Sequence, residues 1–316
     1  MSILMQRLLS FYFDLDCTIT YKPSMQNRSE TALIISPEEV KILLKHFPKG
    51  ICSFDLEMTG LSALFDKVIE IAACKIEPDG KVTTFHSLVN PLITIPEHTI
   101  EYHGLHNEDL RDAPTLKKPL KDFIDFYGNT PLLAHNAKFD ISFIIRGIHE
   151  YNYPVSLSDI YDSCIFPRTL YKKADIKPKS FKLGDLADFF DIKFIHHIAL
   201  EDSVVAMKVF ARCLMYFDDQ AGDKSLKDLA YLFKLNSFKP SGNYILGRKH
   251  VCLKEFVQNK TNIQIKYSGG SYKNEFREVK PISLMALPNG LVLYALCVKS
   301  QMNKYFILKK IKDIKE

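Results

Sequence analysis

The segment SFDLEMTG, residues 53–60, ends an apolar run with two carboxylates, Asp55 and Glu57, that are separated by one residue. The apolar residues around them predict a β-strand, and alternate side chains of a strand point to the same face of a sheet. The two carboxylates would therefore stand together and repel each other unless a cation lay between them. A divalent metal ion would fill that role. Alternatively, the pair lies on a solvated edge strand, where charged side chains are common.

A metal site on these two residues needs further carboxylates, because a divalent ion takes several oxygen ligands. Asp140 shares an apolar helix stripe with Ile144, and Asp202 begins a second stripe that continues through Val205 and Val209. An unpaired carboxylate in an apolar stripe is costly, and attraction to a helix N-terminus, about 0.3–1 kcal/mol, does not offset that cost. A bound cation explains acids in these apolar positions better than the helix N-terminus does. Each acid alone also fits an ordinary first-turn helix carboxylate, and pairing with Lys or Arg stays open.

Three segments together resemble the motifs of the DEDDh group of 3′ to 5′ exonucleases. They are FDLEMTG, AHNAKFD and HHIALED, in the order and approximate spacing of that family. Between the first two, YHGLHNEDLRDAPTLKKPLKDFIDF resembles the matching part of the DnaQ proofreading subunit, whereas DLEMTGL is closer to the oligoribonuclease form. The resemblance covers residues 50–215 approximately, and it implies an α/β fold of the RNase H-like type, a mixed sheet flanked by helices.

The resemblance also implies a site for two Mg²⁺ or Mn²⁺ ions. In that arrangement Asp55 bridges the ions, and Glu57 and Asp202 bind the one on the side of the nucleophile. Asp140 contacts the other ion through water. Two ions about 3.5–4 Å apart activate a water and stabilise the leaving 3′ oxygen in one in-line displacement, which explains why the site is built from acids.

The general base implied by the resemblance is His197, which matches the family's HxAxxD pattern. A histidine titrates near neutral pH, so it can take a proton from the attacking water. The adjacent His196 is the alternative, because only the spacing to Ala199 and Asp202 distinguishes the two.

Five further positions correspond to family residues that lie near the substrate. Met58 and Thr59 meet the terminal 3′ nucleotide through backbone groups, and Leu61 is an apolar wedge against the last base. His103 and Asn136 lie near the scissile strand. Each of the five also fits ordinary packing or turn chemistry.

The elements that position these residues belong to a domain at residues 49–218, where predicted strands and helices alternate. This domain includes a hairpin across Pro78-Asp79-Gly80. Its helices are predicted near residues 115–127, 139–150, 180–190 and 200–217. Residues 1–48 form an N-terminal extension, and its last helix is predicted from the capping box Ser36-Pro37-Glu38-Glu39.

The C-terminal domain, residues 224–316, begins with a predicted helical stretch near 224–235 and continues as short strands and turns. Residues 262–314 resemble a WYL domain, with the family's R-x-V-x-P element beginning at Arg277. The eponymous tripeptide is LVL at 291–293, and lysine or isoleucine replaces the family arginines near the end. The resemblance implies a small β-barrel that senses a small ligand or binds nucleic acid.

The N-terminal segment FYFDLDCTIT contains the DxDxT form of haloacid-dehalogenase-type phosphatases at Asp14 to Thr18. That chemistry needs further motifs on a Rossmann-like sheet, and the short segment before the next domain cannot supply them. We therefore interpret it as a strand or hairpin edge with a polar turn.

The net charge of +5 hides an asymmetry along the chain. From Gly222 to the end there are 18 Lys and Arg against 7 Asp and Glu, which leaves 24 basic and 30 acidic residues in the first 221. This excess suggests a polyanionic partner, although a solvated lysine-rich face produces a similar one. The seven scattered cysteines are typical of a reducing cytoplasm, and charged residues interrupt the apolar start, so no signal peptide and no membrane contact are expected.

The sequence therefore predicts a cytoplasmic, metal-dependent 3′ to 5′ exonuclease that releases nucleoside monophosphates from single-stranded nucleic acid. The DnaQ-like middle segment favours DNA, and the DLEMTGL form favours short RNA, so DNA is the preferred substrate and RNA stays open. The alternative is a nucleic-acid-binding regulatory protein with a ligand-sensing WYL-like domain and little catalysis. The complete set of four acids and one histidine favours the enzyme.

Overall fold

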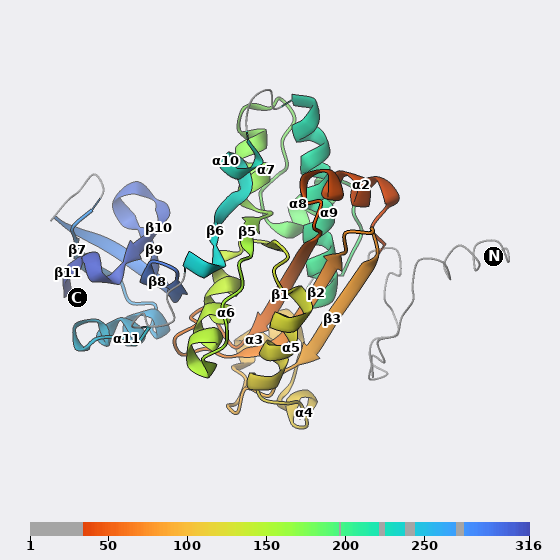
Figure 1. Ribbon diagram of the computed structural model, residues 1–316. Helices are drawn as coiled ribbons and strands as arrows, with labels where there is room; N and C mark the ends of the chain where they lie inside the picture. Colours follow the sequence, from red (N-terminus) through yellow and green to blue (C-terminus); the bar gives the residue numbers. More distant parts are fainter. Residues whose placement is uncertain (1–33, 196, 221–224, 238–243, 270–274) are drawn as a thin grey trace.

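The computed structural model describes the chain as two β-sheets with helices packed around them (Figure 1). The residues that it describes are 34–195, 197–220, 225–237, 244–269 and 275–316. The predicted strand or hairpin edge at Asp14 to Thr18 lies outside these residues, as does most of the N-terminal extension, and so does His196.

The first sheet is mixed, with the strand order β3-β2-β1-β4-β5-β6. Its strands are β1 (Ile51–Met58), β2 (Val68–Ile76), β3 (Val82–Leu88), β4 (Leu132–Ala134), β5 (Asp159–Asp162) and β6 (Tyr231–Lys234). β1, β4 and β5 run parallel, whereas β2, β3 and β6 pair antiparallel with their neighbours. The hairpin predicted across Pro78-Asp79-Gly80 is confirmed, and the φ of +88° at Gly80 explains why glycine stands there.

Helices cover both faces of this sheet and form two apolar cores. The long helices are α2 (Pro37–His46), α5 (Lys117–Tyr127), α6 (Lys138–Tyr151) and α9 (Ala199–Gln220), as the apolar periodicity predicts. α5 and α6 share one core with Phe54 of β1, and α2 and α9 share the other with Ile51. Because successive side chains of a strand point to opposite faces, the odd-numbered residues of β1 face α9.

Shorter helices occupy the connections. They are α3 (Glu97–His103), α4 (Asn107–Leu110), α7 (Ile165–Leu170), α8 (Leu183–Phe189), α10 (Leu226–Ala230) and α11 (Cys252–Gln258). Single 3₁₀ turns lie at Tyr171–Lys173, Leu235–Ser237, Arg248–His250, Val298–Ser300 and Leu308–Lys310. Within the described ranges, no helix has the length and apolar character that a membrane span requires. The six described cysteines are free thiols, and all except Cys252 are buried.

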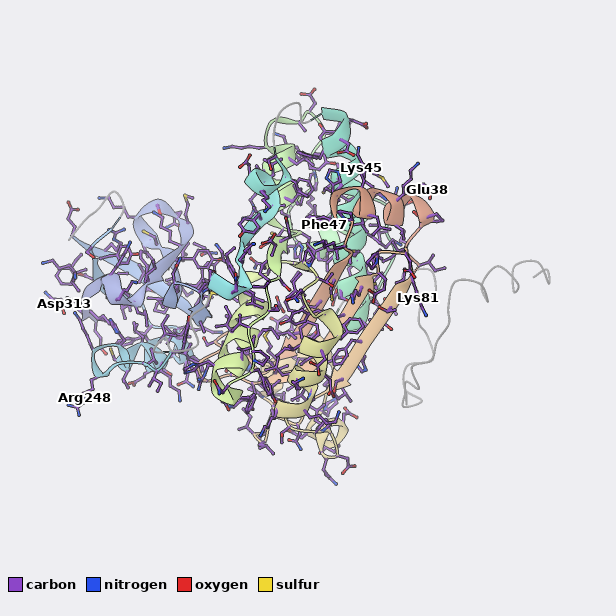
Figure 2. All side chains as sticks on the ribbon, viewed as in Figure 1. Glu38, Lys45, Phe47, Lys81, Arg248 and Asp313 are labelled. Atoms are coloured by element: carbon purple, nitrogen blue, oxygen red, sulfur yellow. The ribbon has the colours of Figure 1, made fainter. Side chains whose placement is uncertain are left out.

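The helix α2 begins at the capping box predicted for it. Ser36 Oγ accepts the Glu39 N–H at 3.2 Å, and Glu39 Oε2 accepts the Ser36 N–H at 2.8 Å. Arg212 of α9 contacts the second Glu39 oxygen at 3.0 Å, so the cap also joins α2 to α9. After the helix, Phe47 points into the core, with its ring centroid 5.0 Å from that of Tyr161, whereas Lys45 points outward (Figure 2).

The helix predicted near 224–235 is correct only as far as Ala230, because residues 231–234 form β6 instead. These residues read YLFK, and aromatic residues favour a pleated, half-buried surface. β6 pairs with β5, with Phe233 opposite Ile160 and Tyr231 opposite Tyr161. The first sheet therefore takes its sixth strand from the region beyond residue 224.

The second sheet is not the closed barrel that the sequence predicts. Its strands are β7 (Ile263–Tyr267), β8 (Phe276–Leu287), β9 (Gly290–Cys297), β10 (Met302–Ile307) and β11 (Ile311–Lys315). They form an open antiparallel sheet in the order β10-β9-β8-β7-β11. The 3₁₀ turn after β10 directs β11 to β7, so in the described part of the chain β10 and β11 do not pair with each other.

The C-terminal sheet packs beside α6 of the first domain (Figure 1). The ring of Phe139 on α6 meets the ring of Tyr294 on β9 edge to face, with centroids 5.3 Å apart. A single apolar cluster includes residues of β1 and α6 together with residues of β8 and β9. The two sheets therefore share a core, and the C-terminal sheet has a fixed place relative to the first.

Candidate active site

The strand β1 holds Asp55 and Glu57 on the face that α9 covers. Phe54 and Leu56 are buried on the opposite face, as the alternation of a strand requires. Because β1 lies between β2 and β4, the alternative of a solvated edge strand is wrong. In the pairing of β1 with β2, Glu57 stands opposite Glu70, which places a further carboxylate beside the predicted pair.

The two helix acids approach β1 from the first turns of α6 and α9. Asp140 is 5% exposed, and its Oδ1 accepts the Leu56 N–H of β1 at 3.3 Å. Asp202 is 8% exposed, and its Oδ2 accepts the His197 N–H at 3.0 Å. The first turn of α6 is thus hydrogen-bonded to β1 through Asp140, and the first turn of α9 is hydrogen-bonded to His197 through Asp202.

Burial raises the pKa of all four carboxyl groups, and repulsion by neighbouring acids adds to this effect. Burial is the main cause in each case, and it raises the pKa of Glu57 to about 8 and those of Asp140 and Asp202 to about 7. The pKa of Asp55 is also well above its usual range, because Asp140, Asp202 and Glu57 repel its charge in addition to burial. None of the four forms an ion pair with a Lys or Arg of the described residues, so pairing with a basic side chain does not explain them.

Three ligand atoms meet at the open side of this cluster. One side-chain atom each from Glu57, His197 and Asp202 lie within 4.8 Å of one another, which is close enough for one ion to contact all three. Burial and neighbouring acids raise the pKa of these carboxylates, and no Lys or Arg of the described part of the chain pairs with them. Such a group fits a divalent cation, because these ions prefer oxygen ligands. The structure therefore provides a donor set suited to a divalent metal ion.

His197 lies on the solvent side of the carboxylates. Its side chain is exposed, and its ring packs against Tyr102 of α3, with centroids 6.0 Å apart. The backbone at His197 has a φ of +63°, a left-handed conformation that costs energy for a residue with a side chain. The bond to Asp202 maintains that conformation and keeps the histidine beside the acids.

Four of the five predicted substrate residues line one cleft with Glu57. The cleft has a volume of about 610 Å³ and is lined by Met58, Thr59, Leu61 and His103. Tyr102, which is 64% exposed, lines it as well, and no sequence pattern predicted a role for this residue. Asn136 does not line the cleft. It lies in the turn before α6 with a φ of +59°, and its N–H bonds to Asp162 at 3.3 Å.

Two acids near the site had no place in the predicted constellation. Asp162 accepts the backbone N–H groups of Asn136 and Ala137 at 3.3 and 3.1 Å, so it shapes the turn that leads into α6 and Asp140. Glu70 Oε1 lies 2.6 Å from His86 Nε2. The sequence could have pointed to Glu70, because it is the single acid within the otherwise apolar VIEIAAC segment. Asp162 can be recognised only from its contacts in the structure.

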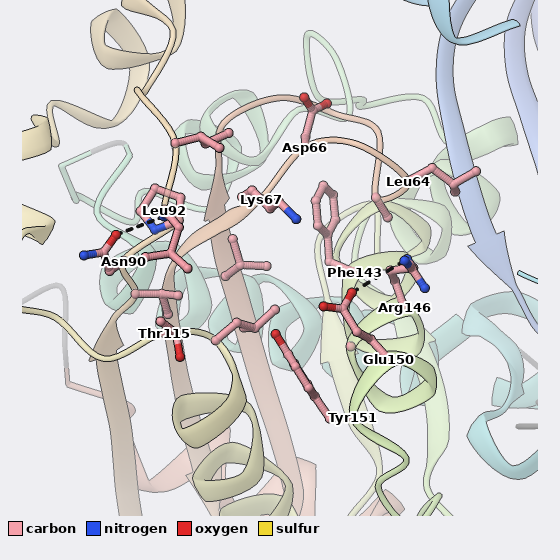
Figure 3. A pocket seen from close by; sticks show the side chains of 17 residues that line it. Leu64, Asp66, Lys67, Asn90, Leu92, Thr115, Phe143, Arg146, Glu150 and Tyr151 are labelled. Atoms are coloured by element: carbon pink, nitrogen blue, oxygen red, sulfur yellow. Dashed lines mark hydrogen bonds and ion pairs between the residues drawn. The ribbon is translucent and has the colours of Figure 1, made fainter. Parts of the chain in front are cut away.

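A second cavity of about 330 Å³ lies between the loop before β2, the loop after β3, and α6 (Figure 3). Its charges are mixed, because Arg146 pairs with Glu150 at 3.5 Å, and Asp66 and Lys67 both line it. None of the predicted site residues lines this cavity. The cleft beside Glu57 is therefore the candidate substrate site.

The fold and this acidic site define a nuclease, and the comparison with protein families agrees. Residues 52–210 match the family described as Exonuclease (RNase T), and the chain belongs to that family. A DNA polymerase III PolC-type from Caldanaerobacter subterraneus is 35% identical over 177 residues, which cover 56% of this chain and 12% of that protein. The PolC-type polymerase of Bacillus cereus is 27% identical over 271 residues, or 83% of this chain and 18% of that protein. The matched part of the chain thus spans less than a fifth of the length of these relatives.

Among solved structures, E. coli Exonuclease I in complex with a dT13 oligonucleotide is similar, with a TM-score of 0.50. The sequence identity is 13%, and the similarity covers 78% of this chain and 55% of that one. At this identity the likeness shows the fold alone. The mixed sheet with helices on both faces is therefore of the RNase H-like exonuclease type.

Proposed function

We propose that this protein is a DEDDh-type exonuclease that removes nucleotides one at a time from the 3′ end of single-stranded nucleic acid. The observation that carries the proposal is the meeting of Glu57, His197 and Asp202 within 4.8 Å, beside the half-buried Asp55 and the buried Asp140. The products are nucleoside monophosphates. The phosphodiester bond is broken by water, so the reaction needs a group that takes a proton and groups that place the 3′ end.

Asp55, Glu57, Asp140 and Asp202 would hold two Mg²⁺ or Mn²⁺ ions. Their oxygens are the ligands that these ions prefer, and their raised pKa values show that charge at this place needs compensation. Bound there, divalent ions supply an activated water and a stabilised leaving oxygen. The chain supplies the rigid frame, because β1 and the first turns of α6 and α9 fix the four carboxylates.

His197 is the proposed general base. It is exposed beside the carboxylates, where a water that attacks the phosphorus has access to its ring. Its backbone bond to Asp202 and its contact with Tyr102 limit the positions that the ring can take. A ring nitrogen of His197 takes the proton of the attacking water and passes it to solvent.

The cleft beside Glu57 is the proposed site of the terminal 3′ nucleotide. The Thr59 N–H donates to the Lys67 carbonyl at 2.9 Å, and Thr59 Oγ1 accepts the Lys67 N–H at 2.9 Å. These bonds close the base of the loop that carries Leu61. Leu61 is 48% exposed, as a wedge against a base requires. Tyr102 offers a flat face to a base, and stacking of this kind tolerates any sequence.

His103 is suited to donate a hydrogen bond to the substrate. Its Nδ1 accepts the Leu105 N–H at 3.0 Å, which leaves Nε2 as the N–H of a neutral ring. Burial is the main cause that lowers its pKa; Glu70 opposes this effect, and the nearby His197 and His106 add to it, so the neutral ring is favoured. Within the described residues the buried Nε2 has no partner, and a phosphate or sugar oxygen would satisfy it.

DNA is the favoured substrate, because the relatives named above are DNA polymerases, and RNA stays as the second choice. The C-terminal sheet, for which we retain the WYL-like assignment, adds a basic surface for nucleic acid or a small ligand. A reducing compartment such as the cytoplasm suits the free thiols.

The test uses the full chain with 5′-labelled single strands of DNA and RNA of matched sequence, in Mg²⁺ or Mn²⁺ and in excess chelator. We expect a ladder that shortens from the 3′ end with metal only, and faster shortening of DNA. The matched control is Asp55→Asn, which should abolish the ladder. Shortening in excess chelator, or internal cuts, would contradict the proposal. Binding without any shortening would favour the regulatory alternative.

A further inference from the structure

The C-terminal part of the chain forms one wall of the substrate cleft. The opposite wall consists of the loop after β1 and of α3, from Glu57 to His103. The C-terminal wall is lined by Val257, Gln258 and Lys260 at the end of α11 and by Ile282 of β8. Among the described residues that line the cleft, Lys260 is the one Lys or Arg.

This wall is attached firmly to the first domain. Ser283 Oγ donates to the Leu61 carbonyl at 2.8 Å, and the Leu284 N–H donates to Ser62 Oγ at 3.0 Å. Ser62 and Ser283 are both almost completely buried. Since Leu61 is itself a cleft residue, these bonds fix the distance between the two walls. Lys260 therefore has a defined place relative to the carboxylates.

Lys260 occupies a backbone position where glycine is usual. The Thr261 N–H bonds to the Phe256 carbonyl at 3.1 Å, and the Lys260 N–H bonds to the Val257 carbonyl at 3.4 Å. This pair of bonds is the Schellman motif that ends a helix, and Lys260 is its left-handed residue, with a φ of +55°. A side chain in this conformation carries strain that glycine avoids. The fold alone thus gives no reason for a lysine here.

The side chain of Lys260 also has no partner that would explain it. It forms no ion pair with any residue that the structure describes. Across the cleft stand Glu57 and Asp66, whose carboxylates repel a polyanionic strand wherever bound metal does not compensate them. A strained, unpaired lysine in such a place indicates a ligand with negative charge.

We propose that Lys260 binds a backbone phosphate of the single strand next to the reacting phosphodiester, and so positions the 3′ end in the cleft. This inference rests on the proposed function. The contact is a charge-assisted hydrogen bond and includes no chemical step. Because it recognises a phosphate, it contributes to the binding of DNA and RNA alike.

The experiment measures binding without hydrolysis, by fluorescence anisotropy of 5′-labelled oligothymidylate and matched oligouridylate with Ca²⁺ in place of Mg²⁺. The variants are Lys260→Gln and Lys260→Gly in the full chain. We expect Kd to rise about three- to tenfold for both strands, and the slope of log K against log salt to fall by about 0.7.

Two control variants separate this contact from general effects. Gln301→Gly relieves the same left-handed conformation, φ +50°, after the 3₁₀ turn Val298–Ser300, and Lys312→Gln removes an exposed lysine of β11. Neither residue lines the cleft, so both should bind strands with the unaltered Kd. Lys260→Gly should melt at the same temperature as the unaltered protein or higher, because glycine removes the strain.

An unchanged Kd and salt slope in both Lys260 variants would overturn the inference. A second result would also overturn it: Lys260→Gly binds weakly and melts at a lower temperature, whereas Lys260→Gln binds normally. That result would assign Lys260 a structural role. Absence of strand binding by the unaltered chain would also overturn it. A chain that binds through Lys260 but does not cut would refute the proposed function and leave this inference intact.

Discussion

Replacing Glu57 by Gln should stabilise the metal-free protein at alkaline pH. Burial, and then repulsion by Glu70, Asp202 and Asp140, raises the pKa of Glu57 from 4.5 to about 8. A carboxyl group whose pKa is higher in the folded than in the unfolded state holds its proton more tightly when folded. It therefore contributes stability below pH 4.5, and this contribution is lost as the pH rises to about 8.

The size of the effect follows from the two pKa values. A difference of one pKa unit corresponds to about 1.4 kcal/mol, so ionising Glu57 costs the metal-free folded state at most about 5 kcal/mol. Neighbouring carboxylates share the protons of the cluster, and this sharing relieves part of the cost. We expect Glu57→Gln, which keeps the shape and removes the charge, to recover about 1–3 kcal/mol near pH 8.

Thermal unfolding in excess chelator measures this difference at about pH 5 and about pH 8. Glu57→Gln should melt above the unaltered protein at the higher pH, and the gap should shrink at the lower one. Added Mg²⁺ should raise the melting temperature of the unaltered protein more than that of the variant, because the ion binds the folded carboxylates. Glu101→Gln, on the exposed side of α3, is the matched control and should change little. Parallel pH curves for the two proteins, or a less stable Glu57→Gln at pH 8, would refute the reasoning.

Three further predictions concern the reaction and its frame. His197→Ala should lower kcat by about 100- to 10,000-fold, whereas His196→Ala should stay near the unaltered rate, and equal rates would remove the general-base assignment. A 3′-terminal phosphate should block digestion in a gel assay, because it adds charge beside the carboxylates, and equal digestion of blocked strands would instead indicate an endonuclease. Asp162→Ala removes the acceptor that shapes the turn before Asp140. It should lower the free energy of unfolding, measured in urea, by about 2–4 kcal/mol and should also lower kcat. An unchanged urea midpoint would contradict this role.

Local patterns in the sequence were sufficient to predict the strand and the helices that carry the acids. The alternation around Asp55 and the apolar stripes behind Asp140 and Asp202 depend only on the period of each element. The capping box at Ser36 depends on four consecutive residues and is confirmed. Such features are visible in sequence because the interactions that define them are short in range.

Features that depend on distant contacts were not predictable in this way. β6 forms because Tyr231 and Phe233 pair with the edge strand β5, about 70 residues earlier in the chain. A local sequence pattern contains no information about that distant edge. The predicted barrel is an open sheet, since the course of β11 is set by its pairing with β7. Glu70 was predicted as part of a strand but not as a neighbour of Glu57, which only the register shows.

The position of the C-terminal sheet changes how its role is best tested. The charge asymmetry suggests that this region has a polyanionic partner, and comparison with a chain that ends near Gly222 is the simplest test of that idea. Such a chain would lack β6 and would expose the shared core around Phe139 and Tyr294, so its loss of binding would be ambiguous. Substitution of Lys260 leaves the core intact and tests the same idea at one contact.

We propose that the carboxylates of β1, α6 and α9 form a site for divalent metal, and the whole function depends on this site. Counting the Mn²⁺ ions bound per chain, from the electron paramagnetic resonance signal of free Mn²⁺ at neutral pH, tests it without reference to activity. About two ions should bind to the unaltered protein, and binding should be lost in Asp55→Asn, which removes the proposed bridging ligand. No bound Mn²⁺, or the same number bound by Asp55→Asn, would contradict it.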